Sequence, residues 1–187
     1  MNKHHIPTLI KMDEGMMEIL RIVSSLQLPD WWIGAGFVRN KVWDQLHGYT
    51  KRTPLNDIDV IYFDPINLNE KDEKRIGQRL KKLRPNLPWS VKNQARMAIV
   101  RGDGPYKNAE EGLSRWVETA TCIGVRMENG KLTLATPLGI DDLVRLILRP
   151  NRKANVSINV FYKRIKEKQW LNLWPKLTVI GEPFPCV

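Results

Sequence analysis

The segment WWIGAGFVRNKVWDQLHGYTKRTPLNDIDVIYFD, residues 31–64, decides the fold. Residues 31–34 predict a short buried strand, and residues 36–47 then have the apolar spacing of a helix. Between them lies Gly34-Ala35-Gly36. Two glycines at a turn from strand to helix let backbone N–H groups approach an anion closely, and the helix N-terminus adds its positive dipole end. This part of the segment therefore predicts a phosphate-binding turn.

The glycine turn does not match two familiar phosphate-binding motifs. The dinucleotide-binding fingerprint requires a further glycine at the position of Arg39, and no Walker A pattern is present. The sequence therefore excludes the Rossmann and P-loop interpretations.

The second half of the segment predicts a strand with two acids on one face. Residues 57–63, DIDVIYF, are mostly β-branched or aromatic, and side chains alternate along a strand, so Asp57 and Asp59 point the same way while Ile58 packs behind them. The two carboxylates, about 7 Å apart along the strand, repel each other unless a cation lies between them. Mg²⁺ prefers such oxygen ligands. The alternative is a solvated strand start, and the nearby glycine turn favours the metal site.

The rest of the chain extends this unit into a mixed fold. Strands are also expected within residues 88–100 and in a hairpin of residues 121–127 and 131–135, whose turn contains the favoured Asn129-Gly130 pair. Residues 175–187 are expected to be irregular. Further helices are predicted over residues 8–27 (with a weak point at Gly15), 69–84, 108–118, 139–148 and 156–171. This order predicts an α+β (or α/β) domain with a small mixed sheet flanked by helices.

Length and composition indicate one ordinary globular domain. The chain has 187 residues, of which 42% are hydrophobic and 27% charged. We expect a single domain over residues 1–187, with its core at 15–150 and a basic C-terminal helix and tail at 151–187. No apolar run is long enough to span a membrane, and the two cysteines, Cys122 and Cys186, form no disulfide framework, so a cytoplasmic location is expected.

The net charge of +10 is concentrated in two stretches. Residues 71–101 hold ten basic and two acidic residues, and residues 145–176 hold nine basic and one acidic residue. These stretches are either ordinary solvated helix faces or a surface for RNA, another polyanion or nucleotide phosphates.

With these residues in view, the chain resembles a known family. GAGFVRN at 34–40, a helix and NDIDV at 56–60 resemble the head domain of polymerase-β-like nucleotidyltransferases, most of all the bacterial CCA-adding and poly(A) polymerase type, whose pattern is GGxVRD followed by DxD. WSVKNQARM at 89–97, WVETAT at 116–121 and TPLGIDDLVRLILR at 136–149 also resemble a small bacterial nucleotidyltransferase family of this type. The resemblance covers residues 15–165.

The resemblance implies Mg²⁺-dependent transfer of a nucleotidyl group from an NTP to a hydroxyl acceptor, with release of pyrophosphate. Gly34-Ala35-Gly36 would hold the triphosphate, and Arg39 would lie near phosphate or ribose. Asp57 and Asp59 would be the catalytic residues and would bind Mg²⁺.

Three further residues are candidates for nucleotide binding. Lys92 and Arg96 share one strand face if the strand persists that far, and would then face the triphosphate; otherwise they are surface charges. Asn93 could coordinate the metal through its carbonyl oxygen.

The sequence also departs from the family pattern. Ala35 replaces a glycine and Asn40 replaces an aspartate. The family places a third carboxylate on a neighbouring strand, but residues 88–96 contain no acid, and Ser90 stands where the small family often has Glu. A weakened or one-metal site is therefore possible. The long helical regions that grip tRNA in CCA-adding enzymes are absent, so full CCA addition is not expected.

Three functions stay open from the sequence. The first is a Mg²⁺-dependent nucleotidyltransferase acting on an unknown hydroxyl acceptor. The second is a catalytically weak NTP- or RNA-binding module of the same fold. The third is a regulatory protein whose basic helix at 156–171 docks on an acidic partner. The sequence predicts no oligomeric state.

Overall fold

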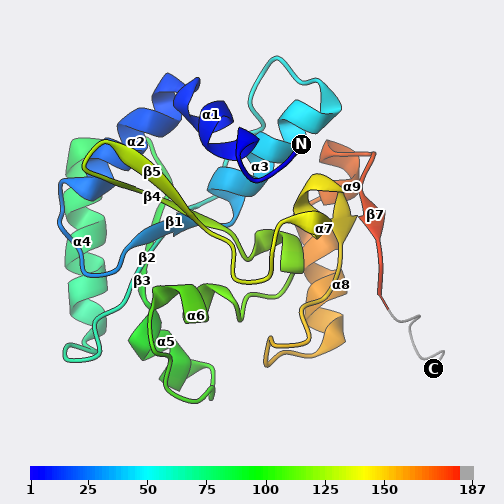
Figure 1. Cartoon of the computed structure of the whole chain (residues 1–187). Coiled ribbons are helices and arrows are strands. Elements are labelled where there is room, and N and C mark those ends of the chain that lie inside the picture. The colour runs from blue at the N-terminus through cyan, green and yellow to red at the C-terminus, as the bar shows by residue number, and fades with distance from the viewer. Residues whose placement is uncertain (182–187) are drawn as a thin grey trace.

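The computed structural model of the chain describes residues 1–181 (Figure 1). Cys186 lies outside these described residues. The helices are α1 (His5–Lys11), α2 (Glu14–Ser24), α3 (Gly36–His47), α4 (Glu70–Leu83), α5 (Gln94–Val100), α6 (Ala109–Leu113), α7 (Asp141–Val144), α8 (Ile158–Glu167) and α9 (Trp170–Leu173), with a 3-10 turn η1 (Thr119–Thr121). The strands are β1 (Trp32–Gly34), β2 (Ile58–Tyr62), β3 (Trp89–Asn93), β4 (Gly124–Glu128), β5 (Lys131–Ala135), β6 (Ile147–Leu148) and β7 (Thr178–Val179).

A five-stranded mixed sheet organises the fold, in the order β3-β2-β1-β4-β5. Only β2 and β3 are parallel; the other neighbours are antiparallel. In the pairing of β1 with β2, Trp32 lies opposite Ile61 and Ile33 lies opposite Val60. Because β1 and β2 are antiparallel, the glycine turn that follows β1 lies near the start of β2, where the two aspartates stand.

The two faces of the sheet bury different side chains. Ile33 and Val60 belong to the main core, which also contains buried residues of α1, α2, α3 and α4. Trp32 and Ile61 belong to a smaller cluster with Leu113 of α6. Figure 1 shows α5 and α6 on the opposite side of the sheet from α1 and α2. Since side chains alternate along β2, its acidic residues face the same side as Ile61 and α6.

The predicted α+β fold with a small mixed sheet flanked by helices is confirmed. The helix over residues 36–47 begins and ends where the sequence predicts, and Gly48 adopts the left-handed conformation of a C-cap, with φ 73°. The hairpin is confirmed as well, with Asn129 and Gly130 at φ 49° and 75°, but its first strand begins at Gly124 and not at residue 121.

Several predicted boundaries are wrong. The helix predicted over residues 8–27 is two helices, which separate before Gly15 because Asp13 caps α2 by accepting a hydrogen bond from the Met16 N–H. The helix predicted over residues 156–171 is interrupted at Gln169, which has φ 50°.

Two short strands were also not predicted. The helix predicted over residues 139–148 contains only α7, because Ile147–Leu148 forms β6. Thr178–Val179, in the predicted irregular tail, pairs with it as β7. This pairing joins segments far apart in the sequence, so local patterns carry no signal of it. Within residues 1–181, no helix has the length and apolar character needed to cross a bilayer.

Candidate active site

The turn between β1 and α3 holds one residue in an unusual conformation. Ala35 has φ 46° and ψ −118°, a backbone region that glycine enters freely and a residue with a Cβ rarely does. The glycine of the family pattern at this position therefore has a conformational reason, and Ala35 stores local strain. The Arg39 N–H donates to the Ala35 carbonyl at 2.8 Å, so the turn leads directly into the first turn of α3.

The residues of this turn have different surroundings. Ala35 and Gly36 line a cavity of about 340 Å³, a volume in the range of small-molecule sites. Gly34 does not line this cavity: an added Cβ would lie 2.6 Å from Cη2 of Trp116, so Gly34 provides room for the indole ring.

Asp57 and Asp59 reach the same cavity from the start of β2. Burial of Asp59, together with the neighbouring Asp57, raises the pKa of Asp59 to about 6. Lys168, which follows α8, places its Nζ 3.7 Å from Oδ2 of Asp57. The two carboxylates are therefore close enough to disfavour each other's charge, and a bound cation would relieve this.

The neighbouring strand contributes a hydroxyl where a third acid could stand. Ser90 of β3 is the direct register partner of Asp59 in the parallel pair, and its side chain hydrogen-bonds to Asp59. Among the described residues, no group of three His, Cys, Asp or Glu side chains is placed to hold a metal ion. Asp57 and Asp59 therefore form a two-carboxylate site, whose remaining ligands would come from substrate and water.

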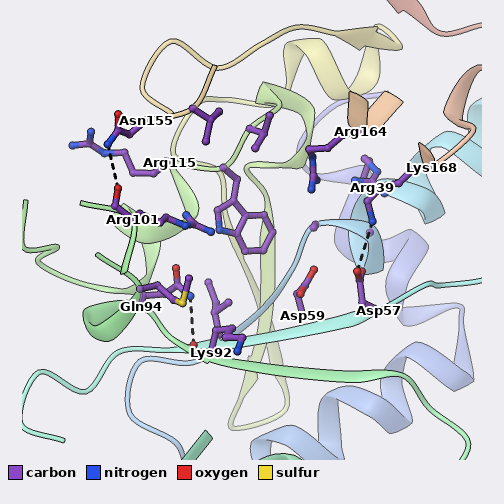
Figure 2. Close-up of a pocket in the computed structure, with 17 residues that line it drawn as sticks. Arg39, Asp57, Asp59, Lys92, Gln94, Arg101, Arg115, Asn155, Arg164 and Lys168 are labelled. Carbon is purple, nitrogen blue, oxygen red and sulfur yellow. Dashed lines mark hydrogen bonds and ion pairs between the residues drawn. The ribbon is translucent and has the colours of Figure 1, made fainter. Parts of the chain in front are cut away.

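Cations surround the two aspartates and continue along the cavity. Figure 2 shows Arg39, Arg164 and Lys168 beside the aspartates, whereas Gln94, Arg101, Arg115 and Asn155 lie at the other end. We call these the acidic end and the distal end of the cavity. Six cationic side chains line its wall, namely Arg39, Lys92, Arg101, Arg115, Arg164 and Lys168. With only two carboxylates to balance them, this wall suits a highly charged anion such as a triphosphate.

Arg39 is held deep at the acidic end. Its side chain is buried, its Cζ lies 4.5 Å from the ring centroid of Trp170, and its Nη2 donates to Asn40 Oδ1 at 2.9 Å. Burial lowers the pKa of Arg39 to about 10, so the guanidinium is still charged at neutral pH. Asn40, which replaces the acid of the family pattern, thus orients Arg39 without neutralising it.

Arg164 is positioned by a buried acid. Its Nε donates to Oε1 of Glu118 at 2.6 Å and its Nη2 to Oε2 at 3.3 Å, and Glu118 is completely buried. Burial alone would lower the pKa of Arg164, but the bonds to Glu118 raise it above its usual value. This ion pair connects α8 to Glu118, which directly precedes η1. It also holds the Arg164 guanidinium at the wall of the cavity.

Replacing Glu118 should destabilise the protein strongly. Glu118→Ala leaves the partly exposed Arg164 without its partner and removes a fully buried acid, so it is expected to lower the free energy of unfolding by about 2–4 kcal/mol, measured by urea denaturation. The control Glu128→Ala removes a half-exposed acid that is 3.4 Å from Arg126, and is expected to cost less than about 1 kcal/mol. Equal effects of the two substitutions would contradict this role of Glu118.

Of the three candidate nucleotide-binding residues Lys92, Asn93 and Arg96, Lys92 alone lines the cavity. Lys92 lines the cavity, with its Nζ 3.5 Å from Glu73 Oε2. Asn93 is buried, caps α5 by accepting from the Ala95 N–H, and donates to the carbonyl of Asp64. It is therefore not available to a metal.

Arg96 does not face the triphosphate side either. The strand ends at Asn93 and the chain turns into α5, so the strand alternation assumed for Lys92 and Arg96 does not hold. Arg96 instead forms a two-bond ion pair with Glu73, at 2.7 and 2.8 Å.

Sequence reasoning missed most of the distal end. Gln94 begins α5, Arg101 directly follows it, Arg115 lies in the segment after α6, and Asn155 lies in the loop before α8. Asn155 Nδ2 donates to the Arg101 carbonyl at 3.2 Å, which joins two of these segments. The available signals were the two basic stretches: residues 71–101 contain Arg101 of the distal end, and residues 145–176 contain Arg164 and Lys168 of the acidic end.

Comparison with known proteins gives a family and a fold. A family model described as "Nucleotidyltransferase" matches residues 21–179. A solved structure whose description reports a CCA-adding enzyme head domain is 27% identical, with a TM-score of 0.83 and 96% of each chain covered. A search of curated proteins finds no match.

Larger solved structures share the fold alone. A CCA-adding enzyme in complex with CTP is 11% identical, with a TM-score of 0.60, and the match covers 94% of this chain and 43% of that one. A Thermotoga maritima CCA-adding enzyme in complex with tRNA is 15% identical, with a TM-score of 0.58, and the match covers 95% of this chain and 42% of that one. The chain thus spans less than half the length of these two enzymes.

Proposed function

The chain belongs to the nucleotidyltransferase family, and from this premise we propose that it transfers a nucleotidyl group from an NTP to a hydroxyl acceptor with Mg²⁺. One observation carries the proposal: Asp57, Asp59 and the turn at Gly36 line one cavity whose wall is otherwise rich in cations. Acids for a metal and cations for phosphates are the two requirements of phosphoryl transfer chemistry.

The donor set at the acidic end fits Mg²⁺. Asp57 and Asp59 offer carboxylate oxygens, and burial together with Asp57 raises the pKa of Asp59, so a bound cation would stabilise its charged form. Mg²⁺ held by these two residues would lower the pKa of the acceptor hydroxyl and neutralise charge on the triphosphate.

The chain's own groups would orient the substrate. Backbone at Gly36 and the Arg39 guanidinium would bind the phosphates, while Arg164 and Lys168 would balance the charge that moves to the leaving group. In the reaction, the acceptor hydroxyl loses its proton to water as its oxygen bonds to the α-phosphorus, the bond from this phosphorus to the bridging oxygen breaks, and pyrophosphate leaves.

A second candidate function is a nucleotide-binding module with weak turnover. Ser90 favours it, because it stands beside Asp59 on the neighbouring strand and contributes no charge to the metal site. Such a module would bind Mg²⁺ and NTP in the same cavity but release pyrophosphate slowly.

We also propose that residues 1–187 form one nucleotidyltransferase-like domain, which acts in the cytoplasm on NTP and on RNA or another polyanion. In support, one main hydrophobic core includes residues from Ile6 to Leu177. The net charge of +10 favours a polyanionic acceptor, and binding of RNA should then weaken steeply with salt.

The proposal predicts Mg²⁺-dependent NTP binding and pyrophosphate release. The melting temperature should rise with NTP plus Mg²⁺ more than with either alone, since a ligand at 100 times its Kd adds about 2.7 kcal/mol of stability. An NTP labelled at the α-phosphate, incubated with an RNA oligonucleotide as acceptor probe, measures transfer. Binding without transfer or pyrophosphate release would favour the second candidate, and no Mg²⁺-dependent shift with any NTP would overturn both.

A further inference from the structure

The cavity concentrates polar atoms that have no partner. Among the described residues, five buried side-chain nitrogen or oxygen atoms lack a hydrogen bond, and four belong to residues that line this cavity. These four are Arg39 Nε, Gln94 Oε1, Arg115 Nε and Trp116 Nε1. A buried polar atom without a partner is costly and rare, so their gathering on one cavity points to a ligand that satisfies them.

These atoms divide between the two ends of the cavity. Arg39 belongs to the acidic end, where its charge interacts with Asp57 and Asp59. Gln94 and Arg115 lie at the distal end (Figure 2), whereas Trp116 follows Arg115 in the chain and packs its ring against Gly34. A ligand that satisfies all four atoms must therefore extend from the aspartates to the distal end.

The distal groups are held in place by close packing. An added Cβ at Gly112 of α6 would lie 2.6 Å from Gln94 Oε1, and one at Gly34 would lie 2.6 Å from the Trp116 ring. The Nε2 of Gln94 donates to the Lys92 carbonyl at 3.4 Å, which assigns the free position to its oxygen. The cavity wall therefore presents one held acceptor, Gln94 Oε1, and two unpaired donors on neighbouring residues, Arg115 Nε and Trp116 Nε1.

The chemistry of this set excludes phosphate as its full ligand. Phosphate oxygens only accept hydrogen bonds at neutral pH, so they could bind Arg115 and Trp116 but would repel the carbonyl oxygen of Gln94. A nucleobase carries donors and acceptors on one edge. The pairing edges of cytosine and uracil each present two acceptors and one donor, which complements two donors and one acceptor. The guanine edge presents two donors, and the adenine edge only one acceptor.

We propose that Gln94, Arg115 and Trp116 form a base-recognition subsite that makes the protein prefer pyrimidine nucleoside triphosphates. This inference rests on the proposed function, because it places the triphosphate at the acidic end and the base at the distal end. All three side chains that would bind the base come before α8 in the sequence.

The affinity of the intact protein for each NTP tests the subsite. Isothermal titration calorimetry with Mg²⁺ would give Kd for CTP, UTP, ATP and GTP, with tripolyphosphate as a probe that carries no base. The two pyrimidine nucleotides should bind about tenfold more tightly than the two purine nucleotides, as expected for one or two well-placed hydrogen bonds. Equal affinities, or a preference for purines, would overturn the subsite even if all four bind.

Two conservative variants test the assignment to these residues. Trp116→Phe removes the indole N–H and Gln94→Met removes the carbonyl; each should reduce the pyrimidine preference to less than about threefold. Trp89→Phe is the matched control, since the Trp89 Nε1 donates to the Arg84 carbonyl and Trp89 does not line the cavity.

The outcomes separate this inference from the proposed function. Retained tripolyphosphate binding in both variants would show that their phosphate end is folded, and an unchanged pyrimidine preference would then overturn the assignment. If neither tripolyphosphate nor any NTP binds the wild-type protein, the proposed function itself fails. If one variant does not fold, the other variant and the wild-type preference decide.

Discussion

Asp57→Ala and Asp59→Asn should each reduce the proposed nucleotidyl transfer by about 10³-fold or more, because among the described residues these two supply the carboxylates that line the cavity and would hold Mg²⁺. Removing one of two carboxylates takes away half of the charge that the protein offers the cation. The loss should appear in turnover and in the Mg²⁺-dependent rise of the melting temperature. Initial rates of pyrophosphate release at saturating NTP measure it.

Asp64→Asn is the matched control for these variants. Asp64 follows β2, and its Oδ1 accepts the backbone N–H groups of Ile66 and Asn67, which an asparagine oxygen can also accept. Asp64 does not line the cavity. Wild-type turnover in Asp57→Ala or Asp59→Asn, or an equal loss in Asp64→Asn, would contradict the assigned metal site.

Stability measurements separate loss of chemistry from loss of fold. The pKa of Asp59 is about 6 in the folded protein, above its usual 3.8, so ionisation of Asp59 destabilises the fold as pH rises through this interval. Without metal, Asp59→Asn should therefore be more stable than the wild-type protein above pH 6 and similar to it below pH 3.8. A variant that is inactive and more stable has lost a functional group, not its structure.

Ser90→Glu should strengthen the metal site. Ser90 is the register partner of Asp59 in the parallel pair of β2 and β3, and it shares strand parity with Lys92, which lines the cavity. A carboxylate at this position would add a third charged ligand. Mg²⁺ affinity and turnover are then expected to rise by about tenfold, because affinity for such cations depends on the number of charged ligands.

The matched control is Ser90→Gln, which has the size of glutamate without its charge. Without Mg²⁺, Ser90→Glu should be less stable than the wild-type protein, because three carboxylates then repel one another, and Mg²⁺ should restore the loss. Calorimetric Mg²⁺ titrations and pyrophosphate release measure both effects. If Ser90→Glu gains no more than Ser90→Gln, the missing third acid does not limit this protein.

The basic helix at residues 156–171 illustrates how tertiary structure changes an interpretation. From the sequence, its cations could have served a docking surface for an acidic partner. In the structure, Arg164 of this helix pairs with the buried Glu118, and Lys168 lies beside Asp57. Two of its cations thus belong to the cavity, while Lys163 and Lys166 are exposed.

The sequence by itself determined the strand, the glycine turn, the helix after it and the two aspartates on one strand face. These are local signals, because periodicity, turn chemistry and strand alternation act over a few neighbouring residues. The family resemblance begins with the same segment and extends to residues 89–97, 116–121 and 136–149. The strand alternation extended from Lys92 to Arg96 failed for a local reason too, since the chain turns into α5 at Gln94.

Only the tertiary structure decided which other residues face the aspartates. Arg115, Asn155, Arg164 and Lys168 lie far from Asp57 in the sequence, and each occurs in a segment with several other polar or basic residues. Whether such a residue points into the cavity or into solvent depends on long-range packing, such as the contact of α8 with Glu118. Local sequence patterns contain no information about that packing. The residues of the distal end could therefore be identified only from the folded structure.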